Sequence, residues 1–113
     1  MKTYLSAKIH KAAVTQAELD YIGSITIDSS LMERVGIEHY EKVLVVSNTS
    51  GARLETYAIP GESGSGVICM NGAAAHLIKQ GEEIIIMSFV VTNEFVSPKQ
   101  ILVDKQNKFI KNL

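Results

Sequence analysis

The sequence has only one cysteine, Cys69, among its 113 residues. A single cysteine excludes an internal disulfide and a metal cluster built on cysteine ligands, and a buried structural thiol is the simplest interpretation of Cys69. The three histidines, His10, His39 and His76, are far apart and lack the spacing of metal ligands. The sequence therefore gives no reason to expect a metal site.

Long apolar runs and runs of like charge are also missing. No apolar stretch reaches the roughly 18 residues needed to cross a bilayer, and residues 1–10 lack the charged-then-apolar order of a signal peptide. The 11 basic and 12 acidic residues are scattered, which leaves no basic surface for nucleic acid or anionic lipid. We therefore expect a soluble, cytoplasmic protein that binds neither nucleic acid nor a membrane.

The overall composition is that of a folded globular domain. Hydrophobic residues make up 46% of the chain and charged residues 20%, which excludes a disordered chain and a coiled coil. A domain of this length buries about two-thirds of the surface that its unfolded chain exposes. Since there is no linker and no repeat, residues 1–113 are predicted to form a single domain with one core.

Short apolar segments dominate the chain and predict a β-rich fold. Strands are expected over residues 4–10, 24–27, 42–47, 54–59, 67–70, 83–91 and 101–103. Turn-forming residues separate them at 48–51, 60–66 and 71–72, a spacing typical of barrels and sandwiches. Residues 43–46 and, apart from Ser88, residues 84–91 are apolar at consecutive positions, which predicts strands covered on both faces, inside a barrel or at a subunit contact.

Two short helices are also expected. The first spans residues 29–35, with Asp28 placed to cap its first amides and Gly36 to end it. The second spans residues 73–79, and the N–H groups of its first turn point toward whatever lies beside the preceding Asn71-Gly72 turn. Residues 15–18 have the form of a capping box, but their β-branched neighbours fit a strand equally well, so their structure stays open.

The pair Gly23-Ser24 is the first sign of chemistry. A second pair, Gly64-Ser65, lies in a glycine-rich loop, whereas Gly23-Ser24 leads directly into a strand that can hold it rigid. A serine hydroxyl held against the preceding carbonyl can attack it and convert the amide to an ester. Glycine leaves that carbonyl uncrowded and accepts torsions closed to other residues. Elimination from the ester, then hydrolysis of the dehydroalanine, leaves a terminal pyruvoyl group. Taken alone, however, the pair is better explained as an ordinary turn before a strand.

Four further segments, in a fixed order, carry a more specific signal. They are Lys8-Ile9-His10-Lys11, Val14-Thr15-x-Ala17-Glu18-Leu19-x-Tyr21-x-Gly23-Ser24, Thr56-Tyr57-Ala58-Ile59 and Asn71-Gly72-Ala73-Ala74-Ala75-His76. Together they resemble the bacterial pyruvoyl-dependent aspartate 1-decarboxylases, over nearly all of the chain to about residue 91.

This resemblance implies both a fold and an activity. The expected fold is mainly β, a double-psi β-barrel with short helices, assembled as a homotetramer. The expected enzyme is a cytoplasmic carbon–carbon lyase that converts L-aspartate to β-alanine and carbon dioxide on the route to pantothenate. Self-cleavage would give a β chain, residues 1–23, and an α chain, residues 24–113, with the pyruvoyl group on Ser24 in place of pyridoxal phosphate. The sequence leaves open whether cleavage is spontaneous or needs a maturation partner.

The resemblance also assigns roles to individual residues. The pyruvoyl ketone forms a Schiff base with aspartate and accepts electrons as the carboxylate leaves. Tyr57 is the candidate proton donor, and Thr56 would polarise the Gly23 carbonyl and later contact the substrate. For the two carboxylates of aspartate, Arg53 offers a bidentate fork and Lys8 a compact charge, and we rank Arg53 first. Without the resemblance, these side chains would be assigned to strand packing and solvated charge.

The segment after the predicted strand 67–70 is expected to border the substrate. Its small residues would let a substrate approach the main chain closely, although an ordinary turn followed by helix-forming alanines is the structural alternative. The expected substrate-binding residues here are Asn71, which would reach the pyruvoyl region, Gly72, Ala73 and Ala74. Tyr21 and His10 also match family positions, and Tyr21 is a candidate to line the pocket of a neighbouring subunit.

The sequence has two alternative interpretations. A small β-barrel that never processes Gly23-Ser24 could serve as a binding or assembly module without catalysis. A serine hydrolase is disfavoured, because the chain has no G-x-S-x-G elbow. The self-processing decarboxylase is the function that the sequence favours.

Overall fold

A computed structural model describes all residues, 1–113, and has nine strands and two short helices. The strands are β1 (Lys2–Ala13), β2 (Gln16–Glu18), β3 (Ser24–Asp28), β4 (Lys42–Ser47), β5 (Arg53–Gly61), β6 (Ile68–Asn71), β7 (Glu83–Thr92), β8 (Lys99–Val103) and β9 (Phe109–Asn112). The helices are α1 (Ser29–Val35) and α2 (Ala74–Leu77). The prediction of a mainly β fold with short helices is confirmed.

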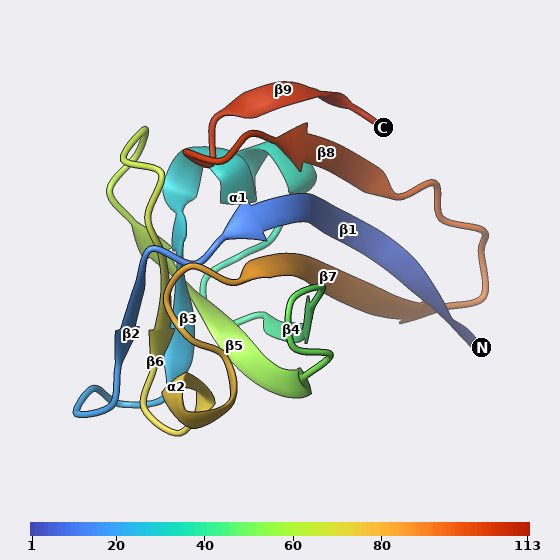
Figure 1. The fold of residues 1–113 in the computed structure, drawn as a ribbon. Coiled ribbons are helices and arrows are strands. Elements are labelled where there is room, and N and C mark those ends of the chain that lie inside the picture. The colour runs from blue at the N-terminus through green and yellow to red at the C-terminus, as the bar shows by residue number, and fades with distance from the viewer.

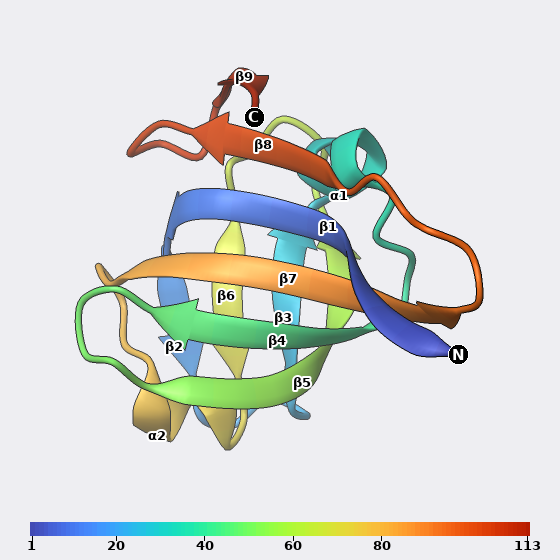
Figure 2. The ribbon, with the colours of Figure 1, turned by 90° about the vertical axis from the view of Figure 1, so that its right-hand side faces the viewer.

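The strands form one strongly curved sheet, in the order β2-β6-β3-β5-β4-β7-β1-β8-β9. Three of its pairings, β1 with β8, β2 with β6 and β3 with β5, are parallel, and the others are antiparallel. Figure 2 shows β8, β1, β7, β4 and β5 lying across β2, β6 and β3, which run behind them in a crossing direction. This arrangement is a small β-barrel, with α1 near one end and α2 at the other (Figure 1).

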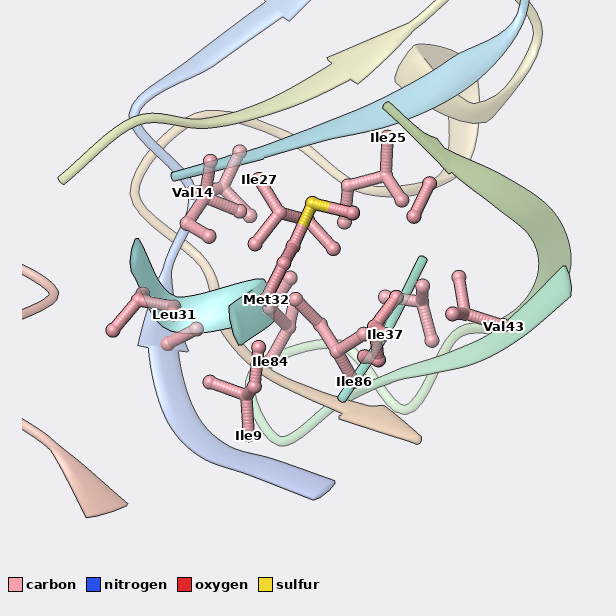
Figure 3. Packing of buried hydrophobic residues seen from close by; sticks show 14 of the residues in the cluster. Ile9, Val14, Ile25, Ile27, Leu31, Met32, Ile37, Val43, Ile84 and Ile86 are labelled. Carbon is pink, nitrogen blue, oxygen red and sulfur yellow. The ribbon is translucent and has the colours of Figure 1, made fainter. Parts of the chain in front are cut away.

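The core lies between these two crossing layers. Alternate residues of the strands point inward, so Ile25 and Ile27 of β3 face Ile84 and Ile86 of β7, all fully buried. Met32 of α1 reaches in among them, as Figure 3 shows. Burying each such side chain stabilises the fold by roughly 1.5–3 kcal/mol. The core therefore fixes β3, the strand that begins at Ser24.

Helix α1 has the limits that the sequence predicts. The side chain of Asp28 accepts a hydrogen bond from the Ser30 amide at 2.9 Å and caps the first turn. Gly36 ends the helix in the left-handed conformation, with φ of 79°, and its N–H donates to the Met32 carbonyl at 2.8 Å. Both predicted caps are confirmed.

Asp28 also ties the loop between β5 and β6 to the end of β3. Its carboxylate, in a residue only 1% exposed, accepts from the amides of Gly64 at 3.0 Å and Gly66 at 2.8 Å. Burial by itself would raise the pKa of Asp28, but the hydrogen bonds from Ser30, Gly66 and Gly64 outweigh it and hold the pKa below its ordinary value. The carboxylate is therefore a charged anchor on which β3 and the start of β6 both depend.

Several predicted elements differ in extent. The second helix is a single turn, Ala74–Leu77, because Ile78 turns into an extended conformation with its side chain fully buried. Residues 16–18, which the sequence left open, form β2. The edge strand β9 was not predicted at all; its Phe109 lies under the Arg34 guanidinium, 3.7 Å from the ring centroid.

The strands expected to be covered on both faces are covered on one. In β4, Val43 and Val45 are buried while Leu44 is only half-buried. In β7, the terminal residues 89–91 are exposed. The outer apolar face is therefore open in a single chain. No helix is long and apolar enough to cross a membrane.

Candidate active site

Ser24 is the first residue of β3 and only 2% exposed. In the antiparallel pairing with β6 it lies opposite Asn71, and Thr26 lies opposite Cys69. Since Ile25 points into the core, these four polar side chains share the other face of the two strands. The prediction that Ser24 leads directly into a strand is confirmed.

The side-chain amide of Asn71 links this group. Its Nδ2 donates to Ser24 Oγ and to Thr26 Oγ1, both at 2.9 Å. Its Oδ1 accepts from Cys69 Sγ at 3.1 Å. Asn71 is 2% exposed and Cys69 4%, so these bonds are shielded from water. The Ser24 hydroxyl is thus held with a hydrogen-bond donor aimed at its oxygen.

Gly72, the next residue, packs directly against the Gly23-Ser24 junction. Its φ is +63°, and a Cβ there would lie 2.8 Å from Gly23 Cα and 2.8 Å from the Tyr21 carbonyl oxygen. Its N–H donates to the Glu18 carbonyl at 2.8 Å. Only glycine fits here, both for its backbone conformation and for the close approach.

The backbone conformation of Gly23 differs from the expected one. Its φ is not in the left-handed region, and a Cβ there would meet nothing nearer than the Asn71 carbonyl oxygen, at 3.9 Å. The expected special torsion is therefore not at Gly23, and the glycine of this junction with a positive φ is Gly72, across the turn. What remains for Gly23 is the expected lack of crowding around its carbonyl.

A cavity of about 250 Å³ opens beside the junction. It brings together the start of β3, strand β5, the end of β6 and helix α2. Its lining residues are Gly23, Leu54, Glu55, Thr56, Asn71, Ala73, Ala74 and Leu77. Five of these were predicted as site residues, and the volume lies below the usual range for drug-sized ligands, which suits a small amino acid.

In a single chain, the negative charge of this cavity is unsuited to binding a dicarboxylate. Glu55 is its only charged lining residue, and it pairs with the exposed Lys42 at 3.0 Å. Arg53, at the start of β5, is exposed and is not among the lining residues. Binding two carboxylates requires positive charge that this lining does not supply.

Lys8 lies outside the cavity of its own chain. It pairs with Met87, Met87 with Leu44, and Leu44 with Glu55, so three strand spacings separate Lys8 from the cavity rim. That path along the sheet is about 14 Å long. Three predicted substrate-binding residues are therefore not among the lining residues: Gly72, which packs against the junction instead, and Lys8 and Arg53, which the chain does not bring to this cavity.

Tyr57 lies on the other face of β5 from its neighbour Thr56. Ile25 of β3 pairs with Ala58, and this register continued by one residue places Ser24 beside Tyr57 on the outer face. The Tyr57 ring lies 6.0 Å from the Tyr40 ring, centroid to centroid. Tyr57 is therefore near Ser24 in the sheet without lining the cavity.

Tyr21 and His10 complete the matched positions. The Tyr21 side chain is 63% exposed next to the Gly23 turn. His10 lies on β1, at a bulge where Lys11 has φ of 65°, and its Nδ1 is buried without a hydrogen-bond partner. Burial, then the charges of Lys8 and Lys11, lowers the pKa of His10. Neither residue reaches the cavity of its own chain.

Several residues of the site were missed in the sequence. Leu54, Glu55 and Leu77 line the cavity, and Thr26 and Cys69 form hydrogen bonds with the side-chain amide of Asn71. The alternation of side chains along a strand could have predicted that Thr26 shares a face with Ser24. The position of Cys69 opposite Thr26, however, follows only from the register between β3 and β6. No group of three or more histidine, cysteine or acidic side chains that could hold a metal is present.

Known proteins resemble the chain along almost its whole length. The sequence profile of the aspartate decarboxylase family matches residues 1–110. Aspartate 1-decarboxylase of Bacillus cereus is 51% identical over 116 residues, covering 99% of this chain and 91% of the relative. The enzymes of that name from Exiguobacterium sibiricum and Bacillus velezensis are 52% and 50% identical, each covering 95% of this chain and 87% of the relative. With Gly23, Ser24 and Asn71 brought together beside a small cavity, the profile match and this level of identity show that the chain belongs to the aspartate decarboxylase family.

Proposed function

We propose that the protein converts L-aspartate to β-alanine and carbon dioxide, on the route to pantothenate, with a pyruvoyl group made from its own Ser24. Family membership supports the reaction. The observation that carries the mechanism is the placement of Ser24, buried at the start of β3, with Asn71 Nδ2 donating to its hydroxyl oxygen at 2.9 Å.

The proposed maturation uses the chain's own atoms. Ser24 Oγ attacks the Gly23 carbonyl carbon, the C–N bond to Ser24 breaks, and the hydroxyl proton ends on the freed nitrogen. Loss of the Cα hydrogen of residue 24 then expels Gly23 as a carboxylate and leaves dehydroalanine. Water replaces the nitrogen, which departs as ammonia, and a ketone remains. The chain is thereby divided into residues 1–23 and 24–113.

The Asn71 amide suits both bond-breaking steps. The Ser24 oxygen becomes negative when the hydroxyl loses its proton for attack, and negative charge returns to the same oxygen when the Gly23 carboxylate departs. A fixed N–H donor in a site shielded from water stabilises such charge far better than it would in bulk solvent. Thr56, on the cavity wall beside Gly23, is the proposed group that polarises the Gly23 carbonyl.

The cavity fits the group that cleavage would create. Residue 24 becomes a chain end directly after Gly23, which lines the cavity together with Ala73 and Ala74, whose small side chains leave the main chain accessible. A pyruvoyl group there supplies a ketone that binds the amino group of aspartate and accepts electrons as carbon dioxide leaves. Tyr57, beside Ser24 in the strand register, is the proposed donor of the proton that completes β-alanine.

The proposal includes assembly into a homotetramer, because the single chain leaves the site incomplete. It also places the enzyme in the cytoplasm. The cavity has no cation among its lining residues, and Lys8 lies about 14 Å away along the sheet, measured as strand spacings. Large apolar side chains beside the junction are exposed: Leu19, Tyr21, Ile22 and Leu77. Patches of this kind mark protein interfaces. We propose that a neighbouring copy covers them and contributes Lys8, while Arg53 turns in from its own chain.

Intact mass and product formation test the proposal together. The purified protein should separate on denaturation into two chains divided before Ser24, and it should form β-alanine from L-aspartate. Ser24→Ala should stay one chain and form none, because no hydroxyl remains to attack. A single full-length wild-type chain after long incubation would instead favour the unprocessed binding module, and cleavage of Ser24→Ala would rule out the proposed maturation.

A further inference from the structure

Cys69 has no part in the proposed chemistry, yet it forms a hydrogen bond with Asn71, the residue that donates a hydrogen bond to Ser24. We propose that Cys69 is a positioning residue for cleavage, whose thiol holds the Asn71 amide in the orientation that donates to Ser24 Oγ. The inference rests on the proposed self-cleavage at Gly23-Ser24 and concerns what sets its rate.

The hydrogen bonds of the amide define its orientation. Asn71 Nδ2 carries two hydrogens and donates to two hydroxyl oxygens, Ser24 Oγ and Thr26 Oγ1. At the other end of the amide, Oδ1 accepts from Cys69 Sγ. Because nitrogen and oxygen sit at opposite ends of one rigid group, a donor at Oδ1 fixes the position of Nδ2 as well.

The flipped amide would oppose cleavage. Half a turn about the terminal bond would place Oδ1 against Ser24 Oγ and Nδ2 against Cys69 Sγ, which is a weak acceptor. The Ser24 hydrogen would then be held by Oδ1, and amide lone pairs would face the oxygen on which negative charge grows. Such an arrangement destabilises the charged transition state that the present orientation stabilises.

Burial makes the thiol hard to replace. Cys69 and Asn71 are 4% and 2% exposed, so water cannot take over the bond to Oδ1. Burial, followed by the charge of Glu18, raises the pKa of the Cys69 thiol. The thiol therefore stays protonated at neutral pH and remains a donor.

Cys69→Ala and Cys69→Ser form a matched pair, since they differ by one hydroxyl and only serine keeps a donor. Each full-length chain is followed by intact mass as it cleaves. Loss of one buried hydrogen bond is expected to slow Cys69→Ala roughly three- to tenfold, whereas Cys69→Ser should stay within about twofold of the wild type. In an Asn71→Ala background, Cys69→Ala and Cys69→Ser should cleave to the same extent, because the thiol acts through Asn71.

Three results would overturn the inference: wild-type cleavage by Cys69→Ala, equal slowing of the alanine and serine variants, or unequal cleavage of the two in the Asn71→Ala background. The first two would leave Cys69 as a packing residue, and the third would mean that it acts by another route. A wild-type chain that never cleaves would instead refute the proposed function, so the two failures are distinguishable.

Discussion

Gly72 provides the sharpest test of how the junction is built. Gly72→Ala adds a Cβ at φ of +63°, within 2.8 Å of Gly23 Cα and the Tyr21 carbonyl oxygen. The left-handed conformation costs a residue with a Cβ about 1–2 kcal/mol, and forcing an extra methyl group against backbone adds about 1–3 kcal/mol. The expected loss of unfolding free energy is therefore about 2–5 kcal/mol.

Gly51→Ala is the matched control. Gly51 has φ of +80°, but a Cβ there meets nothing within 4 Å, so only the conformational cost of about 1–2 kcal/mol applies. Both variants are best compared in the Ser24→Ala background, where every chain stays intact, and at one protein concentration. At roughly 4 °C per kcal/mol, the unfolding temperature should fall by about 8–20 °C for Gly72→Ala and about 4–8 °C for Gly51→Ala.

Cleavage gives a second measure of the same contact. With Ser24 present, Gly72→Ala should also slow cleavage, because the backbone at Gly23 must move away from the added methyl group, whereas Gly51→Ala should cleave at the wild-type rate. Equal losses of stability and unchanged cleavage in both variants would refute the close packing of Gly72 against the junction.

Three further predictions concern the Asp28 carboxylate, the proposed proton donor Tyr57 and the proposed homotetramer. The pKa of Asp28 is depressed in the folded state, so its stabilising effect is complete above the unfolded value of about 3.9 and is lost as pH falls through the folded value. Urea unfolding should show Asp28→Asn less stable than the wild type by at least about 2 kcal/mol at pH 7, with a gap that narrows below about pH 4; a constant gap would contradict a charged anchor. Tyr57→Phe should cleave normally yet form β-alanine at least about tenfold more slowly, because loss of a general acid usually costs more than that. Turnover at the wild-type rate would remove Tyr57 from the role of proton donor. Lys8→Ala and Ser24→Ala, each inactive alone, should regain activity when co-assembled, since one copy then supplies Lys8 and the other the processed residue 24; no recovery in verified mixed assemblies would place Lys8 outside the shared site.

The sequence predicts local structure well where one residue's chemistry decides it. Asp28 and Gly36 set the limits of α1, and alternating apolar residues locate most strands. Strand β9 is missed because its residues 110–112 are exposed and carry no apolar alternation. The second helix is overestimated because burial of Ile78 overrides the helix preference of the residues before it.

The site is predicted less completely, since it depends on register. The resemblance identifies Ser24 and Asn71, but their direct pairing, and the place of Cys69 beside them, follow only from the alignment of β3 with β6. In the same way, the distance of Lys8 from the cavity follows from the β1, β7, β4 and β5 pairings. Such pairings join residues far apart in the chain, which local sequence patterns do not encode.

In the proposed mechanism, residue 24 becomes the group that reacts with aspartate. Reducing the enzyme with sodium borohydride in the presence of L-aspartate, followed by mass analysis of the separated chains, tests it most directly. We expect a covalent aspartate adduct on residue 24 of the chain spanning 24–113, with none on residues 1–23 and none on Ser24→Ala. A cleaved wild-type enzyme that gives no adduct on residue 24 while it forms β-alanine would contradict it.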